Sequence, residues 1–431
     1  MEIYDIITKK KQGLALSREE IQFLIDGYMS GEIADYQMSA LTMAICLKGM
    51  DKLETLYLTE AMLNSGDTVD LSRFGKLSVD KHSTGGVGDK TTLIVAPIVA
   101  SLGCKVAKMS GRGLGFTGGT VDKLESLDGY RVTLSGDEFM SQVDKINISV
   151  VGQSGNLAPA DKKLYALRDV TATVDSIPLI ASSIMSKKLA SGAESIVLDV
   201  KCGSGAFMKT KDEAVSLAKA MIDIGKGFGR GVVALVTNMD APLGYMVGNR
   251  LEVWEAIQVL LGKGEERLTE LCIELASNMA MLSLGIGLDR AREMVKKSVS
   301  SGSALDKMAE WIGYQGGDVS FIHHPEKLLS AKESQGYLAE RDGYITGINA
   351  EEIGRASARL GAGRAKLGDE IDFTAGIILK KSYGDYVKRG DVLAIMQSST
   401  RPFTDCARHL SNAFTISDIK PQPIEIILET V

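Results

Sequence analysis

The chain has 431 residues, of which 45% are hydrophobic and 24% charged, and its formal net charge is -6 at pH 7. A chain of this length and composition is typical of a globular protein with more than one core, so we expect two or three domains. The acidic balance, with both signs mixed along the chain, argues against a nucleic-acid partner, and no apolar run is long enough to span a membrane. We therefore expect a cytoplasmic protein without a membrane partner, whose five scattered cysteines are free thiols.

The first 66 residues predict a small helical domain. A capping box, Ser-Arg-Glu-Glu, stands at 17–20, and apolar residues then recur on one helical face as far as Gly31. A second helix is expected to begin at Asp35 with this residue as its cap, and a third runs from Asp51 to Gly66. The amphipathic segment 160–190 predicts two more helices, which we assign to the same domain.

A different pattern begins at Leu77, where short apolar runs alternate with helical stretches. The runs are 77–79, 105–108, 196–200 and 232–236. This alternation predicts a mostly parallel central sheet with helices on its faces. We assign residues 70–159 and 191–331 to this larger α/β domain, and we interpret the His-His-Pro sequence at 323–325 as a loop.

The tail, residues 332–431, predicts a third domain of α+β type, in which Gly-Asp turns separate β-branched runs. It is similar to the barrel-sandwich half-barrels of biotinyl and lipoyl carrier domains. No lysine stands between small apolar neighbours on a hairpin tip, so we expect a structural role. The expected fold class is α/β, with a helical domain before the sheet domain and this α+β domain after it.

Residues 80–92 follow a predicted strand, pass through three glycines and lead into an apolar helix. Such a turn directs backbone N–H groups and a helix dipole at an anion. The segment is not a P-loop, because Thr84 and Asp89 occupy the two required glycine positions before Lys90-Thr91. From this segment alone, an anion site and a plain tight turn are equally good interpretations.

A second strand, glycine loop and helix at residues 108–125 repeats the arrangement. It is not a dinucleotide fingerprint, because Phe116 stands where the third glycine belongs. Five glycines within 111–119 carry a large entropic cost on folding, which usually reflects close approach of the backbone to a ligand. Together the loops predict one oxyanion site, most simply for inorganic phosphate, with a lysine and four hydroxyls as donors: Lys81, Ser83, Thr92, Ser110 and Thr120.

Four segments resemble the thymidine and pyrimidine-nucleoside phosphorylases. The signature Ser-Gly-Arg-Gly-Leu-Gly-Phe-Thr-Gly-Gly-Thr-Val-Asp-Lys-Leu-Glu occupies 110–125, the phosphate loop occupies 81–88, and further matches lie at 151–157 and 199–208. The likeness extends over essentially the whole chain. It implies that inorganic phosphate cleaves uridine, deoxyuridine or thymidine to the free base and a pentose 1-phosphate, in nucleoside salvage and catabolism.

The resemblance also implies roles for individual residues. Phosphate ligands would be Lys81, Ser83, Thr92, Lys108, Ser110 and Thr120. The base would be bound by Tyr165, Arg168, Ser183 and Lys187, within an apolar wall of Leu114, Ile180, Ile184 and Phe207. The spacing agrees with this, because 165 and 168 are one helical turn apart and 183 and 187 are at i, i+4. Without the resemblance, these helices would be interpreted as ordinary amphipathic surfaces.

The implied chemistry follows from the leaving group. Cleavage of the N-glycosidic bond places positive charge on the sugar and negative charge on the pyrimidine. Arg168 and Lys187 would stabilise the negative charge, and His82, beside the phosphate loop, would donate a proton to the departing carbonyl. We therefore expect these three residues to be catalytic. Because base and phosphate ligands lie in different predicted domains, domain closure is expected as well.

The resemblance implies no organic cofactor, a homodimer formed through the helical domain, and one potassium ion per subunit. The matching potassium ligands are Gly88, Leu243, Met246 and Glu255. Lys90 stands where the family has a small hydroxyl residue in this cluster, so its ammonium either replaces the ion or swings away from it. Phe116 departs as well, since relatives often have histidine there.

Two other classes of function remain open. A phosphoribosyltransferase of related architecture would also bind a phosphorylated sugar, but it needs acidic residues for magnesium near the glycine loop, where Asp80 and Asp89 are the candidates. A binding or signalling protein without catalysis predicts no turnover of uridine with phosphate. In that case His82 and Lys187 would be replaceable without loss of function.

Overall fold

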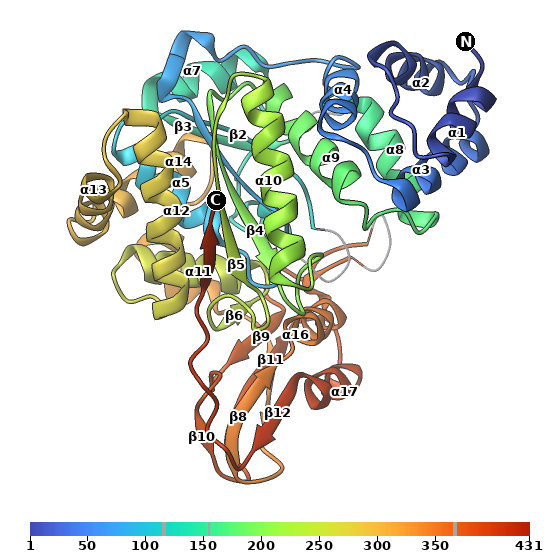
Figure 1. Cartoon of the computed structure of the whole chain (residues 1–431). Helices are drawn as coiled ribbons and strands as arrows, with labels where there is room; N and C mark the ends of the chain where they lie inside the picture. The colour runs from blue at the N-terminus through green and yellow to red at the C-terminus, as the bar shows by residue number, and fades with distance from the viewer. Residues whose placement is uncertain (114–117, 154–155, 365–368) are drawn as a thin grey trace.

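The computed structural model describes residues 1–113, 118–153, 156–364 and 369–431. Figure 1 shows a helical bundle on one side of the molecule, a central sheet between helices, and a β-rich part that extends away from the sheet. The bundle begins with four helices: α1 (Ile3–Lys11), α2 (Arg18–Ser30), α3 (Asp35–Lys48) and α4 (Lys52–Leu63).

Local sequence signals set the ends of these helices. The predicted capping box is present at Ser17, whose hydroxyl accepts from the backbone N–H of Glu20, and Asp51 caps α4 in the same way. Ala34 rather than Asp35 is the N-cap of α3, so the expected cap there is wrong. The apolar faces of the bundle enclose one core, which α8 (Pro159–Val170) and the start of α9 (Ile177–Ala190) complete.

The central sheet is mostly parallel, as predicted. Strands β1 (Val79–Ser83), β4 (Ser195–Cys202) and β5 (Gly231–Asn238) pair in parallel. Strands β2 (Val106–Ser110) and β3 (Ile148–Gly152) form a parallel pair beside β1, to which a bridge between Ser78 and Lys105 joins them. β3 is a strand that sequence reasoning missed.

Helices cover both faces of this sheet (Figure 1). Side chains of β4 alternate between them: Ile196, Leu198 and Val200 pack with α9 and α10 (Lys211–Gly227), whereas Val197 belongs to the core on the other face. The remaining helices of this domain are α5 (Thr91–Ser101), α6 (Thr120–Glu125), α7 (Gly136–Ile146), α11 (Asn249–Leu260), α12 (Glu266–Leu284), α13 (Leu288–Ser300), α14 (Ser303–Tyr314) and α15 (Ser320–His323).

The C-terminal part contains two antiparallel sheets. One has the order β10-β8-β12 and the other β6-β9-β11-β7, and both pack with helices α16 and α17. The bounds are β6 (Met246–Val247), β7 (Glu333–Leu338), β8 (Gly343–Ile348), α16 (Ala350–Ser357), β9 (Gly376–Leu379), β10 (Tyr386–Val387), β11 (Val392–Ser398), α17 (Thr404–Ala413) and β12 (Phe414–Ser417).

Two strands cross the expected boundary of the C-terminal domain. β6 lies between β5 and α11 in the chain, yet it pairs with β9. β13 (Ile427–Thr430) leaves the tail and pairs antiparallel with β5, at the edge of the central sheet. The sequence-based range 332–431 therefore includes a strand that the central sheet incorporates.

Among the described residues, no single helix is both long and apolar enough to cross a membrane. α12 and α13 reach the required length and composition only as a pair, which is bent by 118°.

Candidate active site

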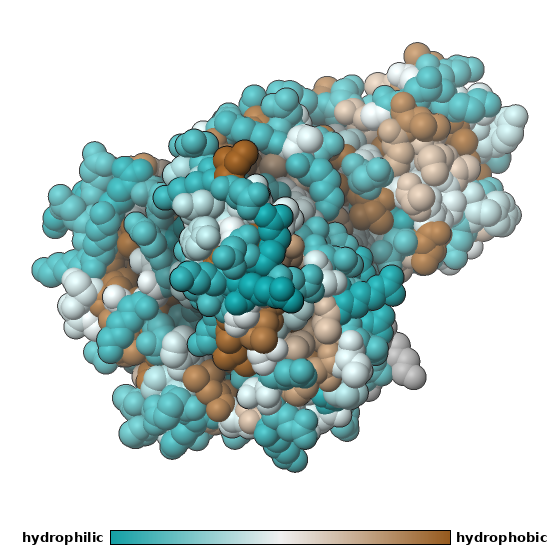
Figure 2. Space-filling view, turned by 90° about the horizontal axis from the view of Figure 1, so that it is seen from below, coloured by the Kyte–Doolittle hydropathy of each residue, from teal (hydrophilic) through white to brown (hydrophobic). Residues whose placement is uncertain are grey.

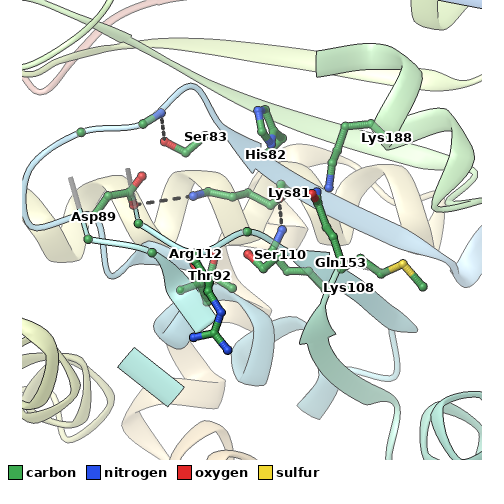
Figure 3. Close-up of a pocket in the computed structure, with 18 residues that line it drawn as sticks. Lys81, His82, Ser83, Asp89, Thr92, Lys108, Ser110, Arg112, Gln153 and Lys188 are labelled. Carbon is green, nitrogen blue, oxygen red and sulfur yellow. Dashed lines mark hydrogen bonds and ion pairs between the residues drawn. The ribbon is translucent and has the colours of Figure 1, made fainter. Parts of the chain in front are cut away.

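The two glycine loops lie side by side because they follow neighbouring parallel strands. One loop joins β1 to α5 and the other joins β2 to α6. The carboxyl ends of parallel strands meet at one edge of a sheet, which is where such folds bind ligands. Between the loops is a pocket of about 200 Å³, shown in Figure 3.

All six predicted phosphate ligands line this pocket: Lys81, Ser83, Thr92, Lys108, Ser110 and Thr120. His82 lines it too, together with four glycines of the second loop, which expose backbone to the space. The lining also includes Asp89, which the sequence suggested only for the phosphoribosyltransferase alternative, and residues that sequence reasoning did not select, among them Arg112, Gln153 and Lys188. Hydroxyls, backbone and ammonium groups converge here, which suits a small oxyanion.

Lys81 is held by one hydroxyl and two carboxylates. Its ammonium donates to the Thr91 hydroxyl and lies 3.8 Å from the Asp89 carboxylate and 3.7 Å from that of Asp199. Lys81 and Asp199 are buried, so the partners fix the amino group and compensate its charge. Burial alone would raise the pKa of the Asp89 carboxyl, but Lys81 and Lys201 outweigh it and hold that pKa well below the usual range.

His82 is neutral at physiological pH. Burial lowers the pKa of its imidazole well below the usual value, and the ammonium groups of Lys188, Lys108 and Lys187 lower it further. The charge of Asp80 acts in the opposite direction but does not compensate. His82 therefore presents one N–H donor and one acceptor nitrogen to the pocket, and no positive charge.

A buried lysine joins the two loops. The ammonium of Lys123, in α6, donates to the backbone carbonyl of Asp89 in the first loop and to that of Gly118 in the second. It also lies 3.0 Å from the carboxylate of Glu252, on α11. Lys123 stands inside the predicted signature, but spacing alone gave it no role. Its contacts make the two loops one structural unit.

The predicted base ligands lie on α8 and α9 and do not line the pocket between the loops. Arg168 is buried, and its guanidinium donates to the backbone carbonyls of Thr173, Val174 and Leu179 at 2.8–3.1 Å. It therefore fixes the turn from α8 into α9, and it retains N–H groups that those carbonyls do not occupy. The ring of Tyr165 lies 5.9 Å from the guanidinium carbon.

Lys187 belongs to a second polar cluster on the same two helices. Its ammonium donates to the carboxylate of Asp161 and, at 3.1 Å, to the hydroxyl of Ser183. Asp161 is a residue that sequence reasoning missed. Ile180 and Ile184 share the partly exposed face of α9 with Lys187. The polar and apolar side chains expected around a base are thus on one side of these helices.

Two predicted members of the apolar wall around the base do not lie with Ile180 and Ile184. Phe207 is 56% exposed and does not line the pocket between the loops. Leu114 lies outside the described residues, as does Phe116.

The predicted potassium ligands converge on the ammonium of Lys90. Its Nζ donates to the carbonyl oxygens of Leu243 and Met246, both at 2.7 Å, and to Oε2 of Glu255 at 2.5 Å. A Cβ added to Gly88 would lie 3.4 Å from this nitrogen, so Gly88 is also next to it. Lys90 has no exposed surface, and its ammonium occupies the centre of the cluster.

Two matches to known families give the class of this protein. Residues 4–66 match the helical bundle domain of a glycosyl transferase family, and residues 75–305 match the a/b domain of that family. Residues 344–417 match the pyrimidine nucleoside phosphorylase C-terminal domain.

Similar proteins narrow this class. The pyrimidine-nucleoside phosphorylase of Geobacillus stearothermophilus is 53% identical over 432 residues, which cover 100% of both chains. That of Staphylococcus epidermidis is 52% identical over 96% of both. The chain therefore belongs to the pyrimidine-nucleoside phosphorylase family.

A solved structure with another activity shares the fold. The crystal structure of anthranilate phosphoribosyltransferase from Thermus thermophilus superposes with a TM-score of 0.56 at 17% identity, over 72% of this chain and 98% of its own. At this identity the likeness concerns the fold alone. It gives the phosphoribosyltransferase alternative only a distant structural relationship.

Proposed function

We propose that the pocket between the glycine loops holds inorganic phosphate as the nucleophile for phosphorolysis of a pyrimidine nucleoside. The observation that carries the proposal is the convergence of all six predicted phosphate ligands on one pocket beside His82. A phosphate oxygen bonds to C1 of the sugar, the bond from C1 to the pyrimidine nitrogen breaks, and its electron pair leaves with the base. The base anion takes up the proton that hydrogen phosphate releases on becoming the ester, so the products are the free base and a pentose 1-phosphate.

The leaving base needs stabilisation of its developing negative charge. Arg168 and Lys187 supply positive charge on the α8 and α9 side, and Ser183 supplies a hydroxyl already bonded to Lys187. Because His82 is neutral, we propose that its N–H hydrogen-bonds to the departing carbonyl oxygen, in place of the proton transfer from an imidazolium that the sequence suggested. Tyr165, Ile180 and Ile184 would pack around the ring.

The base-side and phosphate-side groups line different surfaces in this conformation. In-line attack requires reacting atoms about 3–3.5 Å apart. We therefore propose that the bundle and the sheet domain close on the bound substrates. Closure would also bring Phe207, now exposed, toward the base.

The proposal is tested with uridine, deoxyuridine and thymidine, each incubated with the protein in the presence and absence of inorganic phosphate. Chromatography of uracil or thymine, together with detection of the pentose 1-phosphate, measures the reaction. We expect base release that depends on phosphate. Absence of release from all three nucleosides would refute the proposal.

We further propose that the Lys90 ammonium takes the place of a monovalent cation. Two carbonyl oxygens and a carboxylate are the hard oxygen ligands that such a cation would use, and Lys90 donates to each of them. The pairing neutralises the buried Glu255, which also accepts from the backbone N–H groups of Tyr245 and Met246. Of the two possibilities raised by the sequence, this geometry favours replacement of the ion.

We also propose a homodimer formed through the helical bundle. Large apolar side chains are exposed on α1, α3 and α8: Tyr4, Tyr36, Met43, Leu47 and Val170. Figure 2 shows apolar surface on the lobe that the bundle forms. Burial of such a surface against a second copy is favourable, because contiguous exposed apolar patches mark contact sites. We place the dimer in the cytoplasm, where free thiols such as the five of this chain stay reduced.

A further inference from the structure

One buried carboxylate behind the pocket binds two ammonium groups from different elements. Asp80, on β1, is 1% exposed. Its Oδ1 lies 3.0 Å from Nζ of Lys108, on β2, and its Oδ2 lies 2.7 Å from Nζ of Lys188, on α9. Oδ1 also accepts from the backbone N–H of Lys81 at 2.8 Å. Asp80 therefore connects both phosphate-side strands to the helix that carries the base-side residues.

Lys188 points into the phosphate pocket although it belongs to neither glycine loop. It lines the pocket together with Lys108, and Figure 3 shows it extending from its helix toward the strand that carries Lys81 and His82. Its neighbour Lys187 instead binds Asp161 and Ser183 on the base side. Successive residues of a helix point about 100° apart, so α9 places one ammonium on each side of the reaction.

The charges around the pocket show where an anion is favoured. The group behind the first loop is balanced, with two positive and two negative side chains: Lys81, Lys201, Asp89 and Asp199. The group around the second loop is balanced too: Arg112, Arg364, Asp122 and Glu125. Asp80, by contrast, faces two ammonium groups with one carboxylate. The excess positive charge at the pocket wall therefore lies at Lys108 and Lys188.

Two adjacent buried ammonium groups with one counterion are costly unless a further anion joins them. The pKa of Lys108 is lowered to about 8, chiefly by burial and also by the charges of Lys188 and Lys81, although Asp80 raises it. Burial alone would raise the pKa of the Asp80 carboxyl, but the two lysines hold it far below its usual range. A phosphate dianion in the pocket supplies the missing negative charge.

We propose that Lys188 is a further phosphate-binding residue of this enzyme and that Asp80 is a positioning residue, which holds Lys108 and Lys188 at the pocket wall. The inference rests on the proposed phosphate site and adds a ligand from a helix outside the glycine loops. It also gives a physical connection between the two halves of the reaction, because the helix that supplies Lys187 to the base supplies Lys188 to the phosphate.

The first experiment replaces Lys188 by methionine, which retains a long side chain without the charge. Phosphate affinity is measured directly by calorimetric titration of the full chain with inorganic phosphate alone, and the KM values for phosphate and uridine are measured separately. Loss of one charge-assisted hydrogen bond predicts affinity for phosphate about 10- to 100-fold weaker, with the KM for uridine changed less than about twofold.

The matched control is Lys162→Met, at an exposed lysine on the neighbouring helix α8. It should leave both KM values and the phosphate affinity unchanged. Lys188→Arg, which restores a charged donor, should recover most of the affinity. Phosphate affinity of Lys188→Met within about twofold of the parent would overturn the inference. If the parent protein still turns over nucleoside in a phosphate-dependent reaction, such a result overturns the role of Lys188 and leaves the proposed function intact.

The second experiment tests Asp80 through the pH profile of phosphate affinity in Asp80→Asn. Charged or titratable groups face Lys108 from β1 (Asp80, Lys81 and His82) and from α9 (Lys188). Loss of the carboxylate removes the negative charge that raises the pKa of Lys108, so its ammonium should deprotonate at lower pH. The fall of phosphate affinity at alkaline pH should then begin at lower pH than in the parent.

An unchanged pH profile in a folded Asp80→Asn protein would contradict the positioning role. Circular dichroism establishes whether the variant folds. If it does not, phosphate affinities of Lys188→Met and Lys188→Arg decide the inference: a loss in the first that the second restores supports it, and equal affinities overturn it.

Discussion

At the scale of single residues, the buried and neutral His82 links catalysis to stability in acid. Its imidazole is protonated in the unfolded chain below pH about 6.5 but resists protonation in the folded one. Because the pKa of His82 is lower in the folded state, the unfolded chain binds more protons than the folded protein as the pH falls. Stability that is complete above pH 6.5 is therefore lost progressively below it.

We predict that lowering the pH from 7 to 5.5 costs about 1.3 kcal/mol of unfolding free energy through His82, because the unfolded histidine becomes mostly protonated over that interval. Urea unfolding at both pH values measures this cost. His82→Asn, which retains an N–H donor without a titration in this range, should show a smaller loss. Equal losses in both proteins would contradict the assignment.

The position of Lys90 predicts how activity depends on potassium. Activity of the parent protein should change less than about twofold when potassium replaces choline at constant ionic strength, because the cation position is occupied by an ammonium. Lys90→Thr restores the hydroxyl residue of the family, so its activity should require potassium. A parent protein with the same strong requirement as Lys90→Thr would refute the replacement.

The positions of the residues explain why part of the site could be predicted from the sequence. Lys81, Ser83 and Ser110 lie at the ends of strands directly before the glycine loops, so the glycine pattern marks their positions in the sequence. Asp80, Asp161 and Lys188 stand in regular strands or helices and acquire partners only through packing between distant segments. No spacing rule identifies such pairs, because residues 80 and 188 become neighbours only when α9 docks on β1.

At the scale of elements, the second glycine loop is constrained by its own backbone. A Cβ added at Gly119 would lie 2.1 Å from the backbone nitrogen of Gly113 and 2.3 Å from the carbonyl carbon of Arg112. Neither atom can move without displacing the loop that forms the pocket. At Gly118, its neighbour, the nearest side chain among the described residues is that of Lys123, at 3.5 Å from an added Cβ.

We therefore predict that Gly119→Ala weakens phosphate binding at least about tenfold, since a displacement of about 1 Å in a binding loop is costly. Gly118→Ala is the matched control and should retain most of the affinity. Titration with phosphate and thermal unfolding are measured for both. Similar affinities in the two variants would show that Gly119 has no special steric role.

The element pattern was predictable where periodicity is strong. The capped helices of the bundle, the runs that become β1, β2, β4 and β5, and the pair α8 and α9 follow from local signals. β3 was missed although Ile148, Val150 and Val151 are β-branched, because so short an apolar run does not distinguish a buried strand from the end of a helix. The pairing of β13 with β5 brings together residues almost 200 positions apart, and local sequence has no information on such tertiary pairing.

At the scale of the whole molecule, the apolar surface of the bundle predicts the state of assembly. Leu47, on α3, is 75% exposed. Leu47→Glu should convert a dimer to a monomer in analytical ultracentrifugation, because a desolvated charge at an interface strongly disfavours association. Ile419→Glu is the control, at a residue of the C-terminal part that is 77% exposed, and it should remain dimeric. A dimer in both variants would place the interface elsewhere.

The C-terminal part is joined to the α/β domain at the cluster around Lys90. Met246, whose carbonyl accepts from Lys90, lies in β6, which pairs with β9 of that part. A connection therefore runs from the first glycine loop through Lys90 to a sheet that contains no predicted substrate ligand. This arrangement agrees with the structural role expected for the tail.

The ammonium of Lys90 differs from a dissolved ion in one thermodynamic respect. A bound ion stabilises a folded protein by an amount that grows with the logarithm of its free concentration. A side chain of the same polypeptide has no free concentration, and its contribution to folding is the same in dilute and concentrated salt solutions. The contribution of the Glu255 cluster to the free energy of unfolding would then be independent of the ionic composition of the cell.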